Sequence, residues 1–273
     1  MTDAKPAEAE TIRVEREGAI AHVVLQETTM RPQFFRELGA TFRTLARDTE
    51  LRAVVLRSAV KCFSYGLDLP AAASEMGEAF AGGGALTRMK LLSLIEELQS
   101  EIDAVENCPV PTVVALHGWC IGGGLDLAAA CDIRLASADT KLSLRETKIA
   151  IVADLGSLQR LPAIIGDGLT RELAFTGKDI DATRALQIGL VNAVHDDAAA
   201  VQHAALTMAQ EIAANAPLTV RGVKKVLDFG RSRRRQDGLD YVALFNSAFL
   251  ASEDLGEAMA AFMEKRAPQF KGR

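Results

Sequence analysis

The sequence predicts an α/β fold followed by an all-helical C-terminal region. Short β-type runs alternate with helical patterns over roughly the first 190 residues. From Asp197 onward, helical patterns follow one another without a strand between them. Alternation of strands and helices is typical of helices layered on a sheet. A purely helical tail is typical of an appendage that covers a core or mediates assembly.

The bulk composition is that of a globular protein with a sizeable core. The chain has 273 residues, of which 49% are hydrophobic, and its formal net charge is −5. This charge disfavours nucleic acid and anionic membranes as partners. No run approaches the roughly 20 apolar residues that cross a bilayer. We therefore expect no membrane and no nucleic-acid function.

The chain start and the cysteines indicate a reducing compartment. Residues 1–10 (MTDAKPAEAE) are acidic and lack an apolar segment, which predicts a disordered tail rather than a secretory signal. The four cysteines show no metal-ligand spacing and are expected to be buried thiols. The sequence predicts a cytoplasmic protein without a metal site.

The N-terminal part predicts a hairpin, a helix and a buried strand. Two β-type runs, 11–16 and 20–26, are separated by a turn at Gly18. A helical pattern with apolar residues at spacings of three and four begins at Pro32. The run at 53–57 (AVVLR) predicts a strand that is buried on both faces.

A loop and a variable segment follow this strand. Residues 62–70 predict a loop, and the segment 71–88 is rich in Ala and Gly with weak periodicity. The segment fits a mobile lid and a tolerant surface loop equally well. An amphipathic pattern predicts a helix at 86–105, and the apolar run at 112–116 predicts the next buried strand.

The remaining helices and strands are predicted from the same kinds of apolar pattern. A helix at 125–130 and a strand at 133–136 are expected, then short helices at 169–175 and 183–189 and a closing strand at 191–194. The helices of the C-terminal region are predicted at 197–215, 218–229, 238–250 and 254–265.

Three glycines, Gly122 to Gly124, end a loop and open the helix at 125–130. Glycine lets a ligand approach the backbone, and the free N–H groups of a helix N-terminus attract an anion. Neither a dinucleotide-binding GxGxxG arrangement nor a phosphate-binding GK[ST] motif is present. The pattern alone leaves anion binding and tight packing open.

Three carboxyl groups follow these glycines in mainly apolar surroundings: Asp126, Glu146 and Asp154. An ionised carboxylate in such surroundings is costly unless it is paired or used. The cluster predicts proton transfer beside a developing negative charge. Each acid also has a structural interpretation: a backbone-bonded helix residue for Asp126, a solvated surface acid for Glu146 and a helix cap for Asp154.

Together with a second loop, these motifs resemble a known family. The run FSYGLDL at 63–69 is followed by HGWCIGGGLDLAAACDIRLAS, LSLRE and ADLGSLQRLP. In this order and spacing they resemble the crotonase (enoyl-CoA hydratase/isomerase) superfamily, over nearly the whole chain. The resemblance implies a coiled ββα core at 11–196 with an acyl-CoA site. It also implies a helical trimerisation region at 197–273.

The resemblance also implies the binding groups. The N–H groups of Leu67 and Gly123 would form an oxyanion hole for the thioester oxygen of an acyl-CoA. Residues expected to bind CoA or substrate come from the two loops: Cys62, Phe63, Ser64, Tyr65, Gly66, Asp68, Gly122 and Gly124. Of these, Asp68 is interpreted as a turn or cap residue. No cofactor is expected, because the coenzyme A thioester is the substrate, and the protein would form a homotrimer or hexamer.

The combination of three acids resembles the Δ3,5-Δ2,4-dienoyl-CoA isomerase branch. By this resemblance, Glu146 would take the C2 proton, Asp154 would deliver one to C6, and Asp126 would tune the pair. Two groups are needed because these carbons are too far apart for one carboxylate. Two alternatives stay open: an enoyl-CoA hydratase that uses Asp126 and Glu146, and a non-catalytic acyl-CoA-binding protein.

A basic run at 231–235 (RSRRR) is the one feature that suggests nucleic-acid binding. A short basic run on an acidic protein is usually a solvated connection between helices. We therefore predict a structural role for this run.

Overall fold

A computed structural model describes residues 10–80 and 84–273, and its centre is a six-stranded sheet. The predicted tail, apart from Glu10, lies outside the described residues. The strands, in their order across the sheet, are β1 (Ile12–Glu17), β2 (Ile20–Leu25), β3 (Ala53–Ser58), β4 (Thr112–Leu116), β6 (Ile133–Ser137) and β9 (Ala193–His195). The β1–β2 hairpin is antiparallel and the other pairs are parallel.

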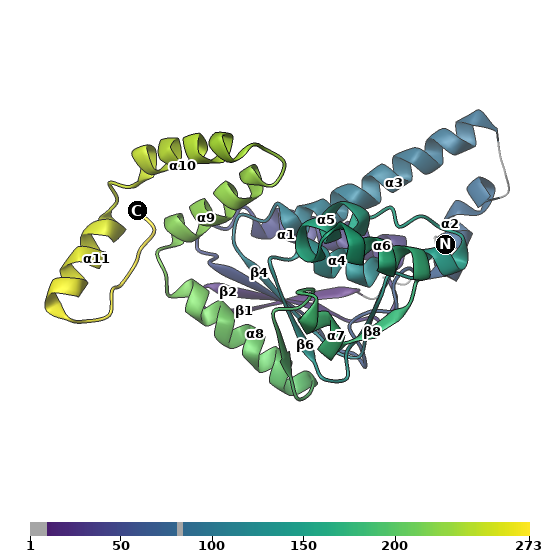
Figure 1. The fold of residues 1–273 in the computed structure, drawn as a ribbon, viewed down its shortest axis with the longest axis horizontal. Coiled ribbons are helices and arrows are strands. Elements are labelled where there is room, and N and C mark those ends of the chain that lie inside the picture. The colour runs from purple at the N-terminus through teal and green to yellow at the C-terminus, as the bar shows by residue number, and fades with distance from the viewer. Residues whose placement is uncertain (1–9, 81–83) are drawn as a thin grey trace, which may run out of the picture.

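Helices cover both faces of the sheet, as Figure 1 shows. Those before β9 are α1 (Pro32–Leu45), α2 (Leu69–Phe80), α3 (Ala85–Glu106), α4 (Gly123–Ala130), α5 (Ser157–Ile165), α6 (Asp167–Thr176) and α7 (Ala182–Gln187). Those after it are α8 (Ala198–Ala213), α9 (Pro217–Gly230), α10 (Arg235–Phe249) and α11 (Glu253–Glu264).

The alternation of side chains along the buried strands separates two hydrophobic cores. Val54 and Leu56 of β3 face the larger core, to which α1, α3 and α4 contribute. Ala53 and Val55 face the opposite side and pack with residues of α8. Because successive side chains of a strand point to opposite faces, a strand that is apolar throughout requires helices on both sides.

Helix α8 belongs structurally to the sheet, although the sequence groups it with the C-terminal appendage. Val201, Ala205 and Ala209 of α8 are fully buried in the smaller core. Among the helices after α8, α10 and α11 lie farthest from the sheet (Figure 1). The short chain segments 214–216 and 231–234 join α8, α9 and α10.

The segment 71–88, predicted as a loop, is largely helical. Helix α2 covers Leu69–Phe80 and α3 begins at Ala85, while residues 81–83 lie outside the described part. The carboxylate of Asp68 accepts a hydrogen bond from the N–H of Ala71 at 2.9 Å and so caps α2. The prediction was wrong for α2 because the high helix propensity of alanine outweighs a weak periodicity.

A second, three-stranded sheet was not predicted. It consists of β5 (Trp119–Ile121), β7 (Lys141–Ser143) and β8 (Asp179–Asp181), and a 3₁₀ helix, η1 (Glu146–Ile149), follows β7. Strands of three residues are too short for a period of two to be recognised in the sequence. This sheet places η1 and the glycine turn after β5 next to each other, because β5 and β7 are paired in parallel.

None of the helices in the described ranges combines the length and apolar character that a membrane span requires.

A buried ion pair joins α9 to the segments that precede β4 and β6. Lys224 of α9 donates to the Asp132 carboxylate at 2.7 Å and to the Val110 carbonyl at 3.3 Å. The same carboxylate accepts from the N–H of Thr112 at 2.8 Å. The Lys224 side chain is only 7% exposed, so its charge depends on this carboxylate.

We expect Lys224→Met to lower the free energy of unfolding by on the order of 3 kcal/mol, because Asp132 would keep a largely buried charge without its cation. Urea denaturation measures this change. The matched control is Arg171→Met on α6, whose ion pair with Asp167 is exposed and should have no measurable effect. Equal stability of both variants would contradict the importance of the buried pair.

Candidate active site

Two backbone N–H groups from distant segments lie side by side. Leu67 forms an isolated parallel bridge with Met30, and Gly123 is the first residue of α4. A Cβ placed on Gly123 would lie 3.9 Å from the nitrogen of Leu67. Within residues 10–80 and 84–273, neither N–H donates to a carbonyl oxygen. Two adjacent donors without an acceptor can bind an oxyanion.

Gly122 brings Glu146 against the glycine turn. Its φ of +52° and ψ of −119° suit glycine alone. A Cβ at this position would lie 3.0 Å from Oε1 of Glu146. The turn is anchored to the small sheet, because the N–H of Gly122 donates to the Ser143 carbonyl at 3.0 Å. Any side chain at Gly122 would therefore strain the backbone and displace the carboxyl group of Glu146.

Asp126 is buried inside the core and caps a helix. It lies on α4, is 1% exposed, and its Oδ1 accepts a hydrogen bond from the N–H of Ser157 at 2.6 Å. Ser157 is the first residue of α5. Burial raises the pKa of Asp126 to about 6, although the hydrogen bond from Ser157 and the charge of Arg160 favour the ionised form. The backbone-bonded role considered for Asp126 is thus present, together with a raised pKa.

Glu146 and Asp154 complete a coupled set of acids. Burial, together with the negative charges of Asp126 and Asp154, raises the pKa of Glu146 to about 7. The Oε2 atom of Glu146 is buried without a hydrogen-bond partner in the described structure. Burial also raises the pKa of Asp154. An orphaned carboxyl oxygen beside a glycine turn is suited to receive a proton from a bound molecule.

Asp154 does not cap α5. Gly156 occupies the N-cap position of α5 and supplies no side-chain hydrogen bond. The carbonyl of Asp154 accepts a hydrogen bond from the side-chain amide of Gln99 on α3 at 2.7 Å. The carboxyl group of Asp154 therefore remains available for chemistry.

The loop predicted to bind CoA is mostly engaged within the chain. Cys62, Phe63 and Ser64 are buried, and the N–H groups of Phe63 and Ser64 donate to the carbonyls of His117 and Trp119. Among these loop residues Tyr65 differs, because its side chain is 37% exposed. Tyr65 is therefore the member of this group whose side chain is accessible to a ligand.

The other predicted binding residues have structural contacts. Asp68 caps α2 and accepts a hydrogen bond from Thr29 at 3.0 Å, which agrees with its interpretation as a cap. Gly124 packs against Ser64, whose Cβ would lie 2.8 Å from a Cβ on this glycine. A Cβ on Gly66 would lie 3.4 Å from the nitrogen of Gly123, so Gly66 lies against one of the two unpaired N–H groups.

The sequence did not single out Gln99 or Arg160. The guanidinium of Arg160 donates to the carbonyl of Leu155 at 3.2 Å. Arg160 lies in the motif ADLGSLQRLP, which was a usable signal, but nothing in the sequence connects Gln99 with Asp154. In the described part of the chain, no group of three or more His, Cys, Asp or Glu side chains is arranged to hold a metal ion.

The fold of the chain has counterparts among solved structures. An enoyl-CoA hydratase from Bacillus anthracis superposes with a TM-score of 0.87 at 28% identity, covering 97% of this chain and 100% of that one. The predicted crotonase-like α/β fold with C-terminal helices is therefore confirmed.

Curated relatives are similar over nearly the full length. A protein from Dictyostelium discoideum named Δ(3,5)-Δ(2,4)-dienoyl-CoA isomerase, mitochondrial, is 40% identical over 266 residues, covering 95% of this chain and 91% of its own. The Arabidopsis thaliana protein of that name, peroxisomal, is 37% identical over 266 residues, covering 96% of both chains.

These names contradict the predicted cytoplasmic localisation. The relatives are named for mitochondria or peroxisomes, so they indicate an organelle. The prediction was wrong because it rested on the acidic first ten residues and on the cysteine spacing, neither of which identifies the compartment of the folded domain.

The glycine turn, the paired N–H donors and the acids all fall within one region of sequence similarity. A model of the enoyl-CoA hydratase/isomerase family matches residues 15–273, which is nearly the entire chain. The chain therefore belongs to the enoyl-CoA hydratase/isomerase family.

Proposed function

We propose that the protein isomerises 3,5-dienoyl-CoA to 2,4-dienoyl-CoA in fatty-acid metabolism. The convergence of three carboxyl groups carries this proposal: Asp126, Glu146 and Asp154 all have raised pKa values, and each of the first two feels the charge of Asp154. The relatives named dienoyl-CoA isomerase support the same activity. A carboxyl group whose pKa is raised toward 7, as for Glu146, can both take and give protons near pH 7.

The thioester carbonyl is placed at the two free backbone donors. The N–H groups of Leu67 and Gly123 would hold its oxygen as negative charge develops there. Each such donor typically contributes about 2.7–4 kcal/mol to the transition state, because it is fixed before the reaction. The dienolate formed on removal of a C2 proton is thereby stabilised.

The two proton transfers use different acids. Glu146 takes a proton from C2, and the electrons of that bond move into the conjugated system and onto the thioester oxygen. Protonated Asp154 then gives its proton to C6, and the double bonds form at C2–C3 and C4–C5. One C–H bond breaks and one forms, so the product is an isomer. Proton exchange with solvent restores Glu146 and Asp154.

The surroundings of Asp126 favour isomerisation over hydration. A hydratase would use Asp126 and Glu146 together to activate one water. However, Asp126 is 1% exposed and one of its oxygens is bound to the N–H of Ser157. We assign Asp126 the tuning of Glu146, because a neighbouring negative charge raises the pKa of that acid.

We propose that no cofactor takes part, since these steps move only protons. A non-catalytic acyl-CoA-binding protein is the remaining alternative. Binding of CoA thioesters without turnover of any 2-enoyl- or 3,5-dienoyl-CoA would favour it.

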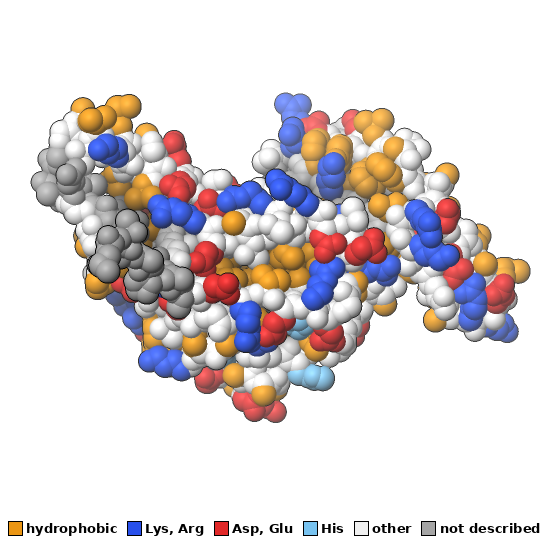
Figure 2. Space-filling view, turned by 180° about the vertical axis from the view of Figure 1, so that it is seen from behind, with side chains coloured by type: hydrophobic (Ala, Val, Ile, Leu, Met, Phe, Trp, Pro, Cys, Tyr) orange, Lys and Arg blue, Asp and Glu red, His pale blue; other side chains and the backbone are white. Residues whose placement is uncertain are grey.

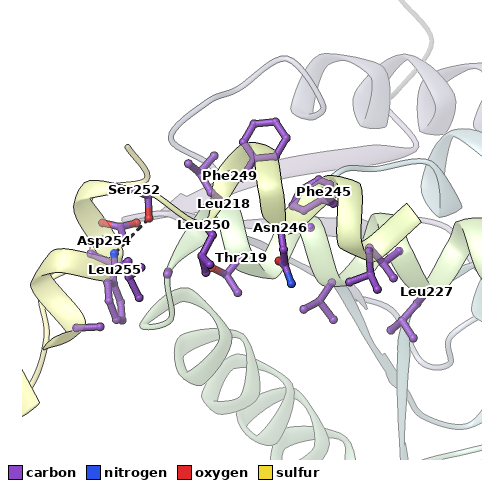
Figure 3. A pocket seen from close by; sticks show the side chains of 17 residues that line it. Leu218, Thr219, Leu227, Phe245, Asn246, Phe249, Leu250, Ser252, Asp254 and Leu255 are labelled. Atoms are coloured by element: carbon purple, nitrogen blue, oxygen red, sulfur yellow. Dashed lines mark hydrogen bonds between the residues drawn. The ribbon is translucent and has the colours of Figure 1, made fainter. Parts of the chain in front are cut away.

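We propose that the C-terminal helices assemble the protein into a trimer or a pair of trimers. A cavity of about 470 Å³ lies between α9, α10 and α11 and is lined mainly by apolar side chains, among them Leu227, Phe245 and Phe249 (Figure 3). Hydrophobic side chains also gather on the projecting helical lobe in the space-filling view (Figure 2). Exposed apolar surface of this kind favours association with another chain.

Asp154→Asn should reduce isomerisation about 10²–10⁴-fold, because the amide cannot give a proton to C6. The rate is followed by the absorbance of the conjugated 2,4-dienoyl product. Asp167→Asn, on the exposed surface of α6, is the matched control. If purified wild-type protein left 3,5-dienoyl-CoA unchanged but hydrated 2-enoyl-CoA, and Asp154→Asn still hydrated it, the hydratase would be the correct assignment.

The pH dependence of kcat/KM should rise with a midpoint near 7 as Glu146 loses its proton and becomes a base. Asp126→Asn removes a negative charge that raises the pKa of Glu146, so the rising limb should move to lower pH. The profile is measured with 3,5-dienoyl-CoA in buffers of constant ionic strength. An unmoved limb in this variant would argue against coupling between the two acids.

Phe262→Asp on α11 should shift the assembly toward monomers, because this side chain is 80% exposed on the proposed interface. Phe175→Asp on α6, with 71% exposure, is the matched control and should leave the assembly intact. Sedimentation equilibrium measures the mass of each variant. A monomeric wild-type protein would refute the proposed assembly.

A further inference from the structure

We propose that Arg160 is a positioning residue for Asp154. It holds the loop 154–156 so that the carboxyl group of Asp154 meets the substrate. This inference rests on the proposed isomerisation and assigns a role to the motif ADLGSLQRLP beyond its acid. Arg160 lies on α5, one turn after the loop. Its side chain is only 8% exposed.

The guanidinium of Arg160 fills the inside of the loop. It donates from Nη1 to the carbonyl of Leu155, the residue next to Asp154, at 3.2 Å. A Cβ on Gly156 would lie 1.8 Å from the same Nη1 atom, and Gly156 has a φ of +116°. The backbone therefore folds around the guanidinium at a point where only glycine leaves room for it.

A second anchor holds the preceding peptide. Gln99 of α3 donates its side-chain amide to the carbonyl of Asp154 at 2.7 Å. Two consecutive carbonyls, those of Asp154 and Leu155, are thus held from α3 and from α5. In the described ranges, the hydrogen-bond donor found for the Asp154 carboxyl group is its own backbone N–H. The position of this carboxyl group consequently depends on the anchored backbone.

The charge of Arg160 is balanced in place. Its Nε donates to Glu106 at 2.8 Å and its Nη2 pairs with Asp103, both on α3. Glu106 also pairs with Arg231, in the basic run that follows α9. Arg231 also pairs with Asp228 at 3.5 Å. Two guanidinium groups and three carboxylates therefore form one network, which satisfies the buried charge of Arg160 and restrains its side chain.

This network forms one wall of a cavity that Asp154 also lines. The cavity has a volume of about 590 Å³ and is bounded by α3, α5 and residues 231–232. Because Arg160 holds the loop directly, a change in Arg160 is expected to move Asp154. It reaches Glu146 only indirectly, through the charge that Arg160 exerts on Asp126. The two proton transfers should therefore respond differently.

The test separates the two transfers in Arg160→Met. In deuterated water, the proton transfer by Glu146 is measured as deuterium that enters C2 of recovered 3,5-dienoyl-CoA. The proton transfer by Asp154 is measured as conversion to the 2,4-dienoyl product. We expect conversion to fall on the order of a hundredfold while C2 exchange stays within about threefold of wild type, since a misplaced acid loses its reacting geometry. Glu146→Gln supplies the exchange background.

Gln99→Met keeps the test decisive if Arg160→Met does not fold. This variant should also lose conversion to product while it keeps deuterium exchange at C2. Gln159→Met, on the exposed side of the same cavity, should leave the ratio of conversion to exchange unchanged. Equal loss of both transfers in a folded variant, or no loss of conversion, would overturn the role of Arg160. Absence of isomerisation in the wild-type protein would instead refute the proposed function.

Discussion

The cost of burying carboxyl groups is the constraint on which the centre of this molecule depends. Asp126 lies inside the core and Glu146 has an oxygen without a partner. A buried ionised carboxylate is unfavourable, so these groups move toward the neutral form. This cost is confined to one region of the protein. There the N–H of Ser157 and the charge of Arg160 stabilise ionised Asp126, and the turn at Gly122 leaves room for Glu146. Because burial destabilises the charged forms, it raises the pKa values of Asp126 and Glu146 toward neutral pH, where these groups can exchange protons.

Two sheets bring the contributing segments together. The large sheet pairs β3 with β4, and the bridge between Ser64 and Cys120 joins the loop after β3 to β5, which leads into the turn before α4. The small sheet then places η1, with Glu146, against that turn through the parallel pairing of β5 with β7. The loop before α5 carries Asp154, and the first N–H group of α5, that of Ser157, donates to Asp126 of α4. A site of this kind cannot be assembled from one element, and each acid comes from a different one.

The basic run at 231–235 could be interpreted from the sequence as a nucleic-acid site or as a connection between helices, and in the structure its residues contact neighbouring helices. Arg231 pairs with Glu106, and the guanidinium of Arg233 lies 4.2 Å from the centre of the Phe229 ring. Arg234 takes part in the cap of α10 through Asp237. Arg231 and Arg233 thus use their charges in contacts with α3 and α9, whereas Arg234 contributes its backbone N–H to the start of α10. The contact of Arg231 reaches the network behind Asp154.

By itself the sequence determined the order of the major elements, the family and the three acids, because apolar periodicity and short motifs are local properties. It could not determine the three-residue strands of the small sheet, which are stabilised by partners distant in the chain, nor α2, whose pattern is weak. Only the tertiary structure decided that Asp126 caps α5, that the loop at 62–65 is mostly engaged internally, and that Gln99 and Arg160 hold the backbone of Asp154. The physical reason is that burial and hydrogen bonding between distant segments depend on how the sheet and helices pack, which residue spacing alone does not specify.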